Sequence, residues 1–293
     1  MIGKTRQKFT SEIQEAFDTE IGKPRGVLRW PPAAGKFRHL RRHPARALAH
    51  CISHYWMVSW DLRAHEPQMQ ETLPHPNVQV IFEKDNSVVS GVHTGKFTRM
   101  LEGQSHVFGI KFNPGGFRPF LKPPVASLMD RTVPVKRIFG KDVEALEEVL
   151  TSRCKESEMI DAANEFFLAR VPKSDPICDL AAQIVERIFR ESAIKTVDDL
   201  VRRAGIGKRS LQRIFREYVG VNPKWVIRRY RLHELLERFH SGARLDLANL
   251  ALELGYFDQA HLINDFRAIV GHSPTEYRKQ MHRDGKGAEA PTV

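Results

Sequence analysis

The chain has little cysteine, and its three cysteines lie far apart in the sequence (Cys51, Cys154 and Cys178). No two of them form a Cys-x-x-Cys pair, and three distant thiols make neither a cysteine zinc site nor a disulfide framework. No apolar run approaches the ~18 residues that suggest a membrane-spanning helix. The basic start, residues 1–8, is not followed by the apolar stretch of a secretory signal. These absences predict a protein of a reducing compartment, the cytoplasm, without a membrane span.

Acidic residues are also in the minority. The 35 Asp and Glu residues against 46 Lys and Arg give a net charge of +11, which favours polyanionic partners such as nucleic acid. A phosphate-binding loop is missing, because the turn Asn-Pro-Gly-Gly at residues 113–116 is not followed by Gly-Lys-Ser/Thr. That turn instead predicts a residue with positive φ. The 293 residues suffice for about two domains.

The first half of the chain has the pattern of a β-rich domain, predicted over residues 1–150. Short segments rich in aromatic and β-branched residues are separated by Gly, Pro and Asn turns, which favours a small barrel or sandwich. The candidate strands are residues 52–60, 78–82, 87–90, 94–100 and 106–112. Residues 1–20 suggest a helical lead-in, and residues 21–46, rich in Pro, Gly and basic side chains, suggest irregular or edge structure.

From residue 142 the pattern becomes helical. Amphipathic helices are predicted at residues 142–150 and 157–169, and the breaker cluster at 172–176 marks the main linker, within a helical linker region of residues 151–174. Asp175 is placed to cap the next helix, with Pro176 at its first position. The chain is therefore predicted to be α+β, with flanking helices on the first domain, an all-α domain at 175–283 and a disordered tail at 284–293.

One stretch of the second domain, residues 247–267, has the layout of two short helices around a tight turn. Its first apolar residues recur at spacings of 3, 4 and 7, which is one helix face. Gly255 can end that helix in the left-handed conformation, and Asp258 can cap the next one. A helix-turn-helix gives this pattern, and so does an ordinary helical hairpin.

The same layout occurs upstream, in residues 199–216. Gly205 matches Gly255 at an offset of 50, whereas Phe215 matches Phe266 at an offset of 51, so the second turn carries one extra residue. The repeat favours two helix-turn-helix units over a chance hairpin. Between the two units, the sequence predicts one long helix at residues 223–239 that begins with proline. This helix is expected to pack into both units. It would separate their second helices by about 34 Å, one turn of DNA. Its cationic residues cluster beside its apolar face (Arg228, Arg229 and Arg231).

Residues 175–283 resemble the DNA-binding domain of the AraC/XylS family of bacterial transcription regulators. The resemblance is carried by residues 211–223 (LQRIFREYVGVNP), 228–232 (RRYRL), 251–266 (ALELGYFDQAHLINDF) and 271–278 (GHSPTEYR). It implies two helix-turn-helix units joined by a long helix, with the second helix of each in successive major grooves. The chain departs from the family at Gly207, where a Ser cap is usual, and at Val201, where Ala is usual.

Residues 38–150 resemble, less strongly, the small N-terminal domain of some members of this family. The segments are residues 49–56, 73–82 and 108–117. The resemblance implies a domain that senses a ligand or mediates dimers, and it names no ligand.

The second helix of the first unit carries the strongest base-reading candidates, Arg209, Gln212 and Arg213. These residues lie one turn apart, and Arg can form a bidentate contact with guanine and Gln with adenine. Lys208 and Arg216 are better placed for phosphates. A basic face that is merely solvated is the alternative.

The second helix of the second unit is expected to contribute less affinity, because it carries less charge. Gln259, Ile263 and Asn264 are the predicted base contacts, with Ile263 against a thymine methyl and Asn264 on adenine. His261 and Arg267 are predicted to hold phosphates.

Metal and catalytic interpretations have less support. A barrel could gather histidines of the first domain around a metal, but they lack a tight paired spacing (His50, His54, His65, His75, His93 and His106). Cys51 lies between His50 and His54, which suggests a nucleophile and hence a DNA-acting alkyl-acceptor repair enzyme. A buried strand cysteine is the alternative, and the clustered cysteines of such repair domains are missing.

The sequence thus predicts a DNA-binding transcription regulator, not an enzyme, without cofactor or metal. Its expected partners are double-stranded promoter or operator DNA, RNA polymerase, a small-molecule effector in an apolar or aromatic pocket of the first domain, and a second copy of the chain. It is expected in the nucleoid-associated cytoplasm. The basic residues of segment 23–46 predict a solvated face, or an auxiliary patch for DNA or an acidic ligand (Lys23, Arg25, Arg29, Lys36, Arg38, Arg41, Arg42 and Arg46).

Overall fold

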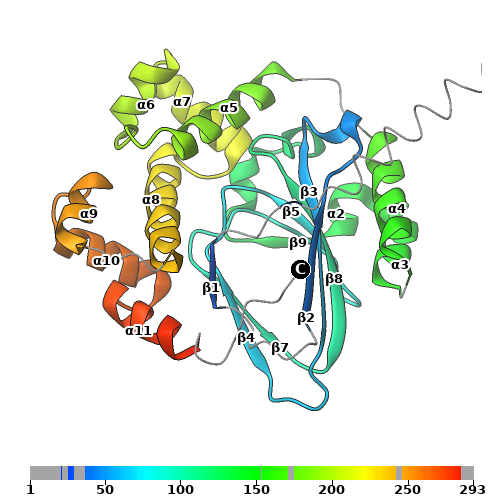
Figure 1. Cartoon of the computed structure of the whole chain (residues 1–293). Coiled ribbons are helices and arrows are strands. Elements are labelled where there is room, and N and C mark those ends of the chain that lie inside the picture. The colour runs from blue at the N-terminus through cyan, green and yellow to red at the C-terminus, as the bar shows by residue number, and fades with distance from the viewer. Residues whose placement is uncertain are drawn as a thin grey trace, which may run out of the picture.

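The structure is a computed structural model that describes residues 21, 26–29, 37–152, 154–170, 175–241 and 246–284. A strand-rich part comes first, and only helices follow it (Figure 1). This confirms the predicted α+β class. The expected lead-in at residues 1–20, most of the 172–176 linker and the tail beyond residue 284 lie outside the described residues. No helix in the described ranges is long and apolar enough to cross a membrane.

Two antiparallel sheets build the strand-rich part, one of order β2-β3-β8-β5-β6-β9 and a smaller one of order β1-β4-β7. The strands are β1 (Val27–Arg29), β2 (Phe37–Arg42), β3 (Ile52–Asp61), β4 (Gln68–Thr72), β5 (Gln79–Phe82), β6 (Val88–Ser90), β7 (Phe97–Leu101), β8 (Gln104–Phe112) and β9 (Thr132–Pro134). The predicted strands are present as β3, β5, β6, β7 and β8. The sequence did not show β4 and β9, which are polar or short, and it suggested only edge structure for β1 and β2, which do lie at sheet edges.

The two sheets pack against each other through a small apolar cluster. Trp60 and Val107 of the larger sheet are buried with Leu101 of the smaller one, and Trp60 Nε1 donates to the carbonyl oxygen of Glu102 at 3.0 Å. The arrangement agrees with the predicted sandwich-like first domain.

Helices cover the other face of the larger sheet, where Figure 1 shows α3 and α4 beside β8. Rings of β8 and these helices pack edge to face, with 5.7 Å between the centroids of Phe112 and Phe167. The predicted helices at residues 142–150 and 157–169 are confirmed as α3 and α4. The helical segments of this part are η1 (Arg46–Leu48), η2 (Arg118–Phe120), η3 (Val125–Leu128), α2 (Val135–Phe139), η4 (Gly140–Asp142), α3 (Val143–Thr151) and α4 (Glu156–Leu168).

The C-terminal helices are arranged along one long helix, α8. Val226 and Ile227 near its start join an apolar core with the first unit, and Leu235 and Phe239 near its end join a second core, as predicted. Asp175 caps α5, because its Oδ1 accepts from Ile177 N at 2.9 Å. The elements are α5 (Pro176–Arg190), α6 (Val197–Ala204), α7 (Lys208–Ile214), the π-helical η5 (Phe215–Val219), α8 (Pro223–His240), α9 (Leu247–Glu253), α10 (Gln259–Val270) and α11 (Pro274–Asp284).

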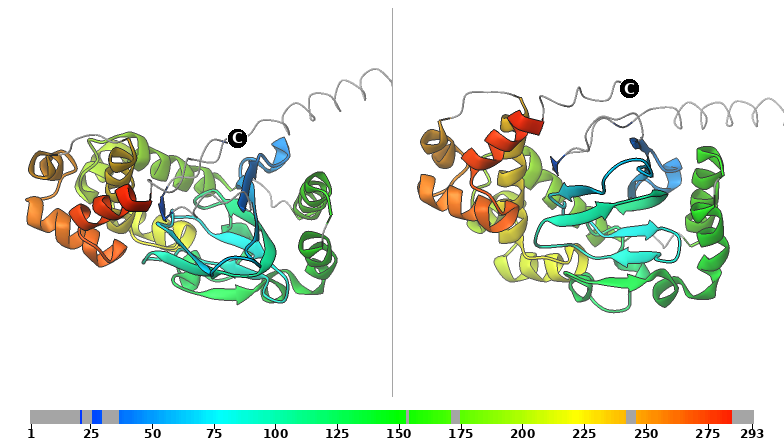
Figure 2. Two further views of the ribbon diagram at one scale, coloured as in Figure 1. Left: turned by 60° about the horizontal axis from the view of Figure 1, so that its bottom comes forward. Right: turned by 90° about the horizontal axis from the view of Figure 1, so that it is seen from below.

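The strand-rich part and the helices share buried surface. Leu28 and Leu73 belong to the second core, and Val92 belongs to the first. Figure 2 shows the strand-rich part on one side of α8, with α9 and α10 on the other. The long helix is therefore held from both sides.

Candidate nucleic-acid interface

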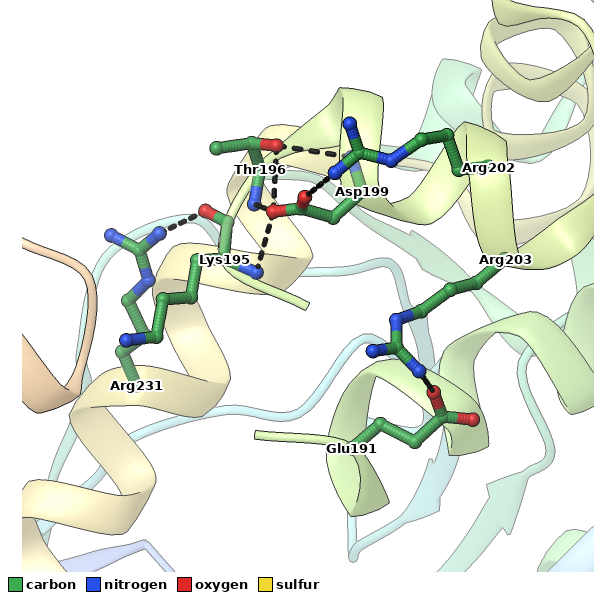
Figure 3. Close-up of polar contacts among 7 residues, drawn as sticks. All are labelled: Glu191, Lys195, Thr196, Asp199, Arg202, Arg203 and Arg231. Atoms are coloured by element: carbon green, nitrogen blue, oxygen red, sulfur yellow. Dashed lines mark hydrogen bonds and ion pairs between the residues drawn. The ribbon is translucent and has the colours of Figure 1, made fainter. Parts of the chain in front are cut away.

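The first helix-turn-helix unit, α6 and α7, is fixed by local hydrogen bonds. The amide of Asp199 donates to Thr196 Oγ1 at 3.0 Å, and the amide of Thr196 donates to Asp199 Oδ2 at 2.8 Å (Figure 3), a capping box that starts α6. Gly205 ends α6 with φ at 65°. α7 then begins at Gly207, where no side chain caps the first amides, in agreement with the departure noted at that position.

The second unit, α9 and α10, repeats this plan with side-chain caps on both helices. Asp246 Oδ1 accepts from Ala248 N at 2.9 Å, Gly255 takes φ at 77°, and Asp258 Oδ1 accepts from His261 N at 2.7 Å. The cap of the second helix follows the turn glycine by one residue more than in the first unit, as predicted. The extra residue is Phe257, whose side chain is 86% exposed.

The candidate base readers of α7 all lie on its exposed side. Leu211 and Ile214 are buried, whereas Arg209, Gln212 and Arg213 are exposed and form no hydrogen bond or ion pair with any part of the chain that the structure describes. The two phosphate candidates are exposed but paired: Lys208 Nζ lies 3.2 Å from Asp198 Oδ1, and Arg216 lies 2.8 Å from Glu217 Oε1. The arrangement leaves the three base-reading candidates available to an external ligand.

The candidates of α10 are less uniform. Gln259, Asn264 and Arg267 are exposed. Ile263 is half-buried because it packs against the second core. Part of its side chain is therefore turned away from a ligand. His261 is exposed, and its ring lies edge-on to Tyr256 at 5.2 Å between centroids.

The structure also reveals a basic cavity where the two units meet, which the sequence had not suggested. This junction pocket has a volume of about 200 Å³. It is lined by Lys195, Lys224, Ile227, Arg228, Arg231, Tyr256 and His261. The one signal in the sequence is the spacing of Lys224, Arg228 and Arg231, which puts them on one helix face. Lys195 and His261 come from separate units, so only the tertiary fold shows that they belong together.

Arg229 differs from its neighbours. The sequence grouped it with Arg228 and Arg231, but it is buried to 1% exposure and turns toward the strand-rich part. Its guanidinium donates to the carbonyl oxygen of Thr94. It is thus unavailable to DNA, and it fixes the long helix to the first part of the chain.

Cys51 does not have the surroundings of a nucleophile. It is buried, and its thiol donates to the carbonyl oxygen of Leu48 at 3.3 Å. Burial raises the pKa of Cys51 to about 11, whereas a reactive thiol needs a lowered pKa. Within the described residues no group of three or more His, Cys, Asp or Glu side chains could hold a metal ion.

Part of the basic segment at residues 23–46 faces inward. Arg41 Nε donates to His54 Nε2 at 3.2 Å, and His54 is paired in register with Lys111 on β8. Burial, and then Lys111 and Arg41, lower the pKa of His54 to about 2; burial, and then Arg41, lower the pKa of Lys111 to about 7. Arg38 forms an ion pair with Glu156. The solvated face predicted for this segment is therefore wrong for Arg41.

Comparisons with known proteins identify the helical part. Residues 200–280 match a family model described as a helix-turn-helix domain, and residues 40–134 match one described as a domain of unknown function, DUF6597. The HTH-type transcriptional activator AarP of Providencia stuartii is 32% identical over 83 residues, which are 28% of this chain and 61% of AarP. The chain thus spans less than two thirds of this relative's length.

Solved structures give weaker likenesses. The DNA-binding domain of AdpA, solved in complex with a target DNA, is 24% identical and covers 38% of this chain and 96% of its own, with a TM-score of 0.31. ToxT of Vibrio cholerae is 12% identical over 83% of this chain and 98% of its own, with a TM-score of 0.36. Scores this low carry no weight for function. The paired helix-turn-helix units and the sequence matches show that residues 200–280 form a helix-turn-helix domain similar to that of transcription regulators such as AarP.

Proposed function

We propose that the protein is a sequence-specific DNA-binding regulator of transcription. The observation that carries the proposal is the pair of helix-turn-helix units on one long helix. On the second helix of the first unit, Arg209, Gln212 and Arg213 are exposed and have no partner among the residues that the structure describes. Gln259 and Asn264 are exposed at the equivalent surface of the second unit. Such side chains read base edges in the major groove.

Control through the strand-rich part belongs to the same proposal. Lys96 Nζ donates to the carbonyl oxygen of Val270, the last residue of α10, at 3.2 Å, and Tyr277 Oη donates to the carbonyl oxygen of Leu28 at 2.9 Å. An effector that shifts these strands would therefore act directly on the second unit. The face that carries Arg41, His54 and Lys111 also carries Trp56, which suits an acidic effector with an apolar body.

The repair-enzyme alternative rests on Cys51 and is disfavoured by the burial and raised pKa of that thiol. As a regulator of this kind, the protein would act on the cytoplasmic nucleoid and would contact RNA polymerase at its promoters, with or without a second copy of the chain.

The test is selection of duplexes from a random-sequence pool by the full-length protein, followed by mobility-shift titration of the recovered sequence. We expect one recurring motif, bound about 10³-fold or more tighter than random duplex. Recovery of no motif, with equal affinity for all duplexes, would overturn the proposal. Cys51→Ser should leave binding unchanged, because the thiol is not part of the reading surface.

A further inference from the structure

The junction pocket gathers basic side chains from three separate segments. Lys195 precedes α6, Lys224, Arg228 and Arg231 lie along α8, and His261 lies in the first turn of α10. None of these segments is adjacent to the others in the sequence. Four cationic side chains and one histidine that converge on a cavity of about 200 Å³ indicate an anion as its occupant.

Two of the cations are held in place by contacts within the chain. Arg231 donates to the main-chain carbonyl oxygen of Lys195, as Figure 3 shows, and its guanidinium lies over the Tyr256 ring, 5.2 Å from the centroid. Lys195 Nζ donates to the carbonyl oxygen of Leu252 at 3.2 Å. Its methylene groups lie against Gly255, where an added Cβ would come within 2.8 Å of Lys195 Cδ. The pocket is thus preorganised.

The pocket retains an excess of positive charge. Asp265 is buried beneath it, and this carboxylate pairs with Arg228 and accepts from Tyr256 Oη at 2.9 Å. Within the described ranges no carboxylate forms an ion pair with Lys195, Lys224 or Arg231. The Nε of Arg231 is buried and has no hydrogen-bond partner among the described residues.

We propose that the junction pocket binds one phosphoryl group. This inference rests on the proposed function: the group is a backbone phosphate of the DNA stretch between the two major grooves. The reason is that the pocket lies where the two units meet, on the helix that joins them. Several N–H donors around one cavity suit a phosphate, which offers more acceptor oxygens than a carboxylate. Inorganic phosphate presents the same chemistry, so the test separates the two sources.

The first arm measures DNA affinity against salt concentration. The duplex is the one that the wild-type protein recovers from a random-sequence pool, and the variant is Lys195→Gln with Lys224→Gln. Loss of one phosphate contact should reduce the slope of log K against log salt by about 0.9. Lys122→Gln with Lys141→Gln removes the same charge from exposed positions of the strand-rich part and should leave the slope unchanged.

The second arm places a neutral methylphosphonate at each backbone position between the two half-sites. One position should weaken wild-type binding and have no further effect on the double variant. The third arm titrates inorganic phosphate into the wild-type protein and the variant by calorimetry, without DNA.

An unchanged salt slope together with phosphate binding that the variant loses would assign the pocket to a free anion. An unchanged slope with no phosphate binding would overturn the proposal while the proposed function stands. If the wild-type protein recovers no duplex, the proposed function fails, and the calorimetric arm alone decides whether the pocket binds phosphate.

Discussion

The guanidinium of Arg229, in the middle of the long helix, donates to the main-chain carbonyl oxygen of Thr94 in the strand-rich part. The indole of Trp225 reaches the same oxygen at 3.4 Å, and its ring lies 4.5 Å below the guanidinium. Burial lowers the pKa of Arg229 to about 10. Lys96, two residues after Thr94, donates to the carbonyl oxygen at the end of α10. Residues 94–96 therefore contact both the joining helix and the second unit.

Arg229→Met should loosen this attachment, because it leaves the Thr94 carbonyl without a charged donor. The loss of a hydrogen bond to a charged group costs about 1.5–3 kcal/mol. Hydrogen exchange of the amides at residues 91–96 should accelerate, while the core around Phe112 keeps its protection. Arg238→Met, at a less buried position of the same helix, is the matched control, and equal exchange in both variants would argue against the attachment.

Arg213→Ala should weaken binding of the selected duplex by about 1–3 kcal/mol and relax specificity at one base position. Arg213 is exposed and has no described partner, so folding should be unaffected. Mobility-shift titration against single-base variants of the duplex measures both effects. Arg137→Ala, an exposed arginine on α2, should change nothing, and an equal loss in both variants would mean that only general charge matters.

Phe257→Ala should lower DNA affinity by about 1 kcal/mol, through a lost apolar contact with a thymine methyl, without lowering stability. The side chain is 86% exposed beside the cap of α10, so it packs little in the folded chain. Leu252→Ala removes another exposed apolar side chain, at 58%, on the neighbouring helix. Fluorescence anisotropy of labelled duplex should separate the two variants, and no difference between them would place Phe257 away from DNA.

His54 should make the fold less stable in mild acid. Its pKa is lowered in the folded protein, so the unfolded chain binds more protons below about pH 6.5, and stability falls as the pH falls. The slope contributed is up to about 1.4 kcal/mol per pH unit. His54→Gln keeps an acceptor for Arg41 but does not titrate, so denaturant unfolding from pH 7 to 5 should show a shallower loss. Parallel curves for both proteins would contradict the assignment.

The sequence predicted what periodicity and capping determine locally. The repeat around Gly205 and Gly255 located both units, and the spacing of the apolar residues showed which side of each reading helix is exposed. It could not show that Arg229 is buried while Arg228 is exposed, because the difference depends on the strand-rich part packing against α8. It also could not show that Ile263, at the border of its helix's apolar face, packs partly against the second core. The junction pocket joins segments that only the tertiary fold brings together.

The central claim is that both units read DNA from one face. Hydroxyl-radical footprinting of the full-length protein on the selected duplex tests it most directly. We predict two protected segments on one face of the helix, about one helical turn apart, with Arg209→Ala plus Arg213→Ala removing one and Gln259→Ala plus Asn264→Ala weakening the other. A single protected segment, lost with the first pair and untouched by the second, would contradict the account.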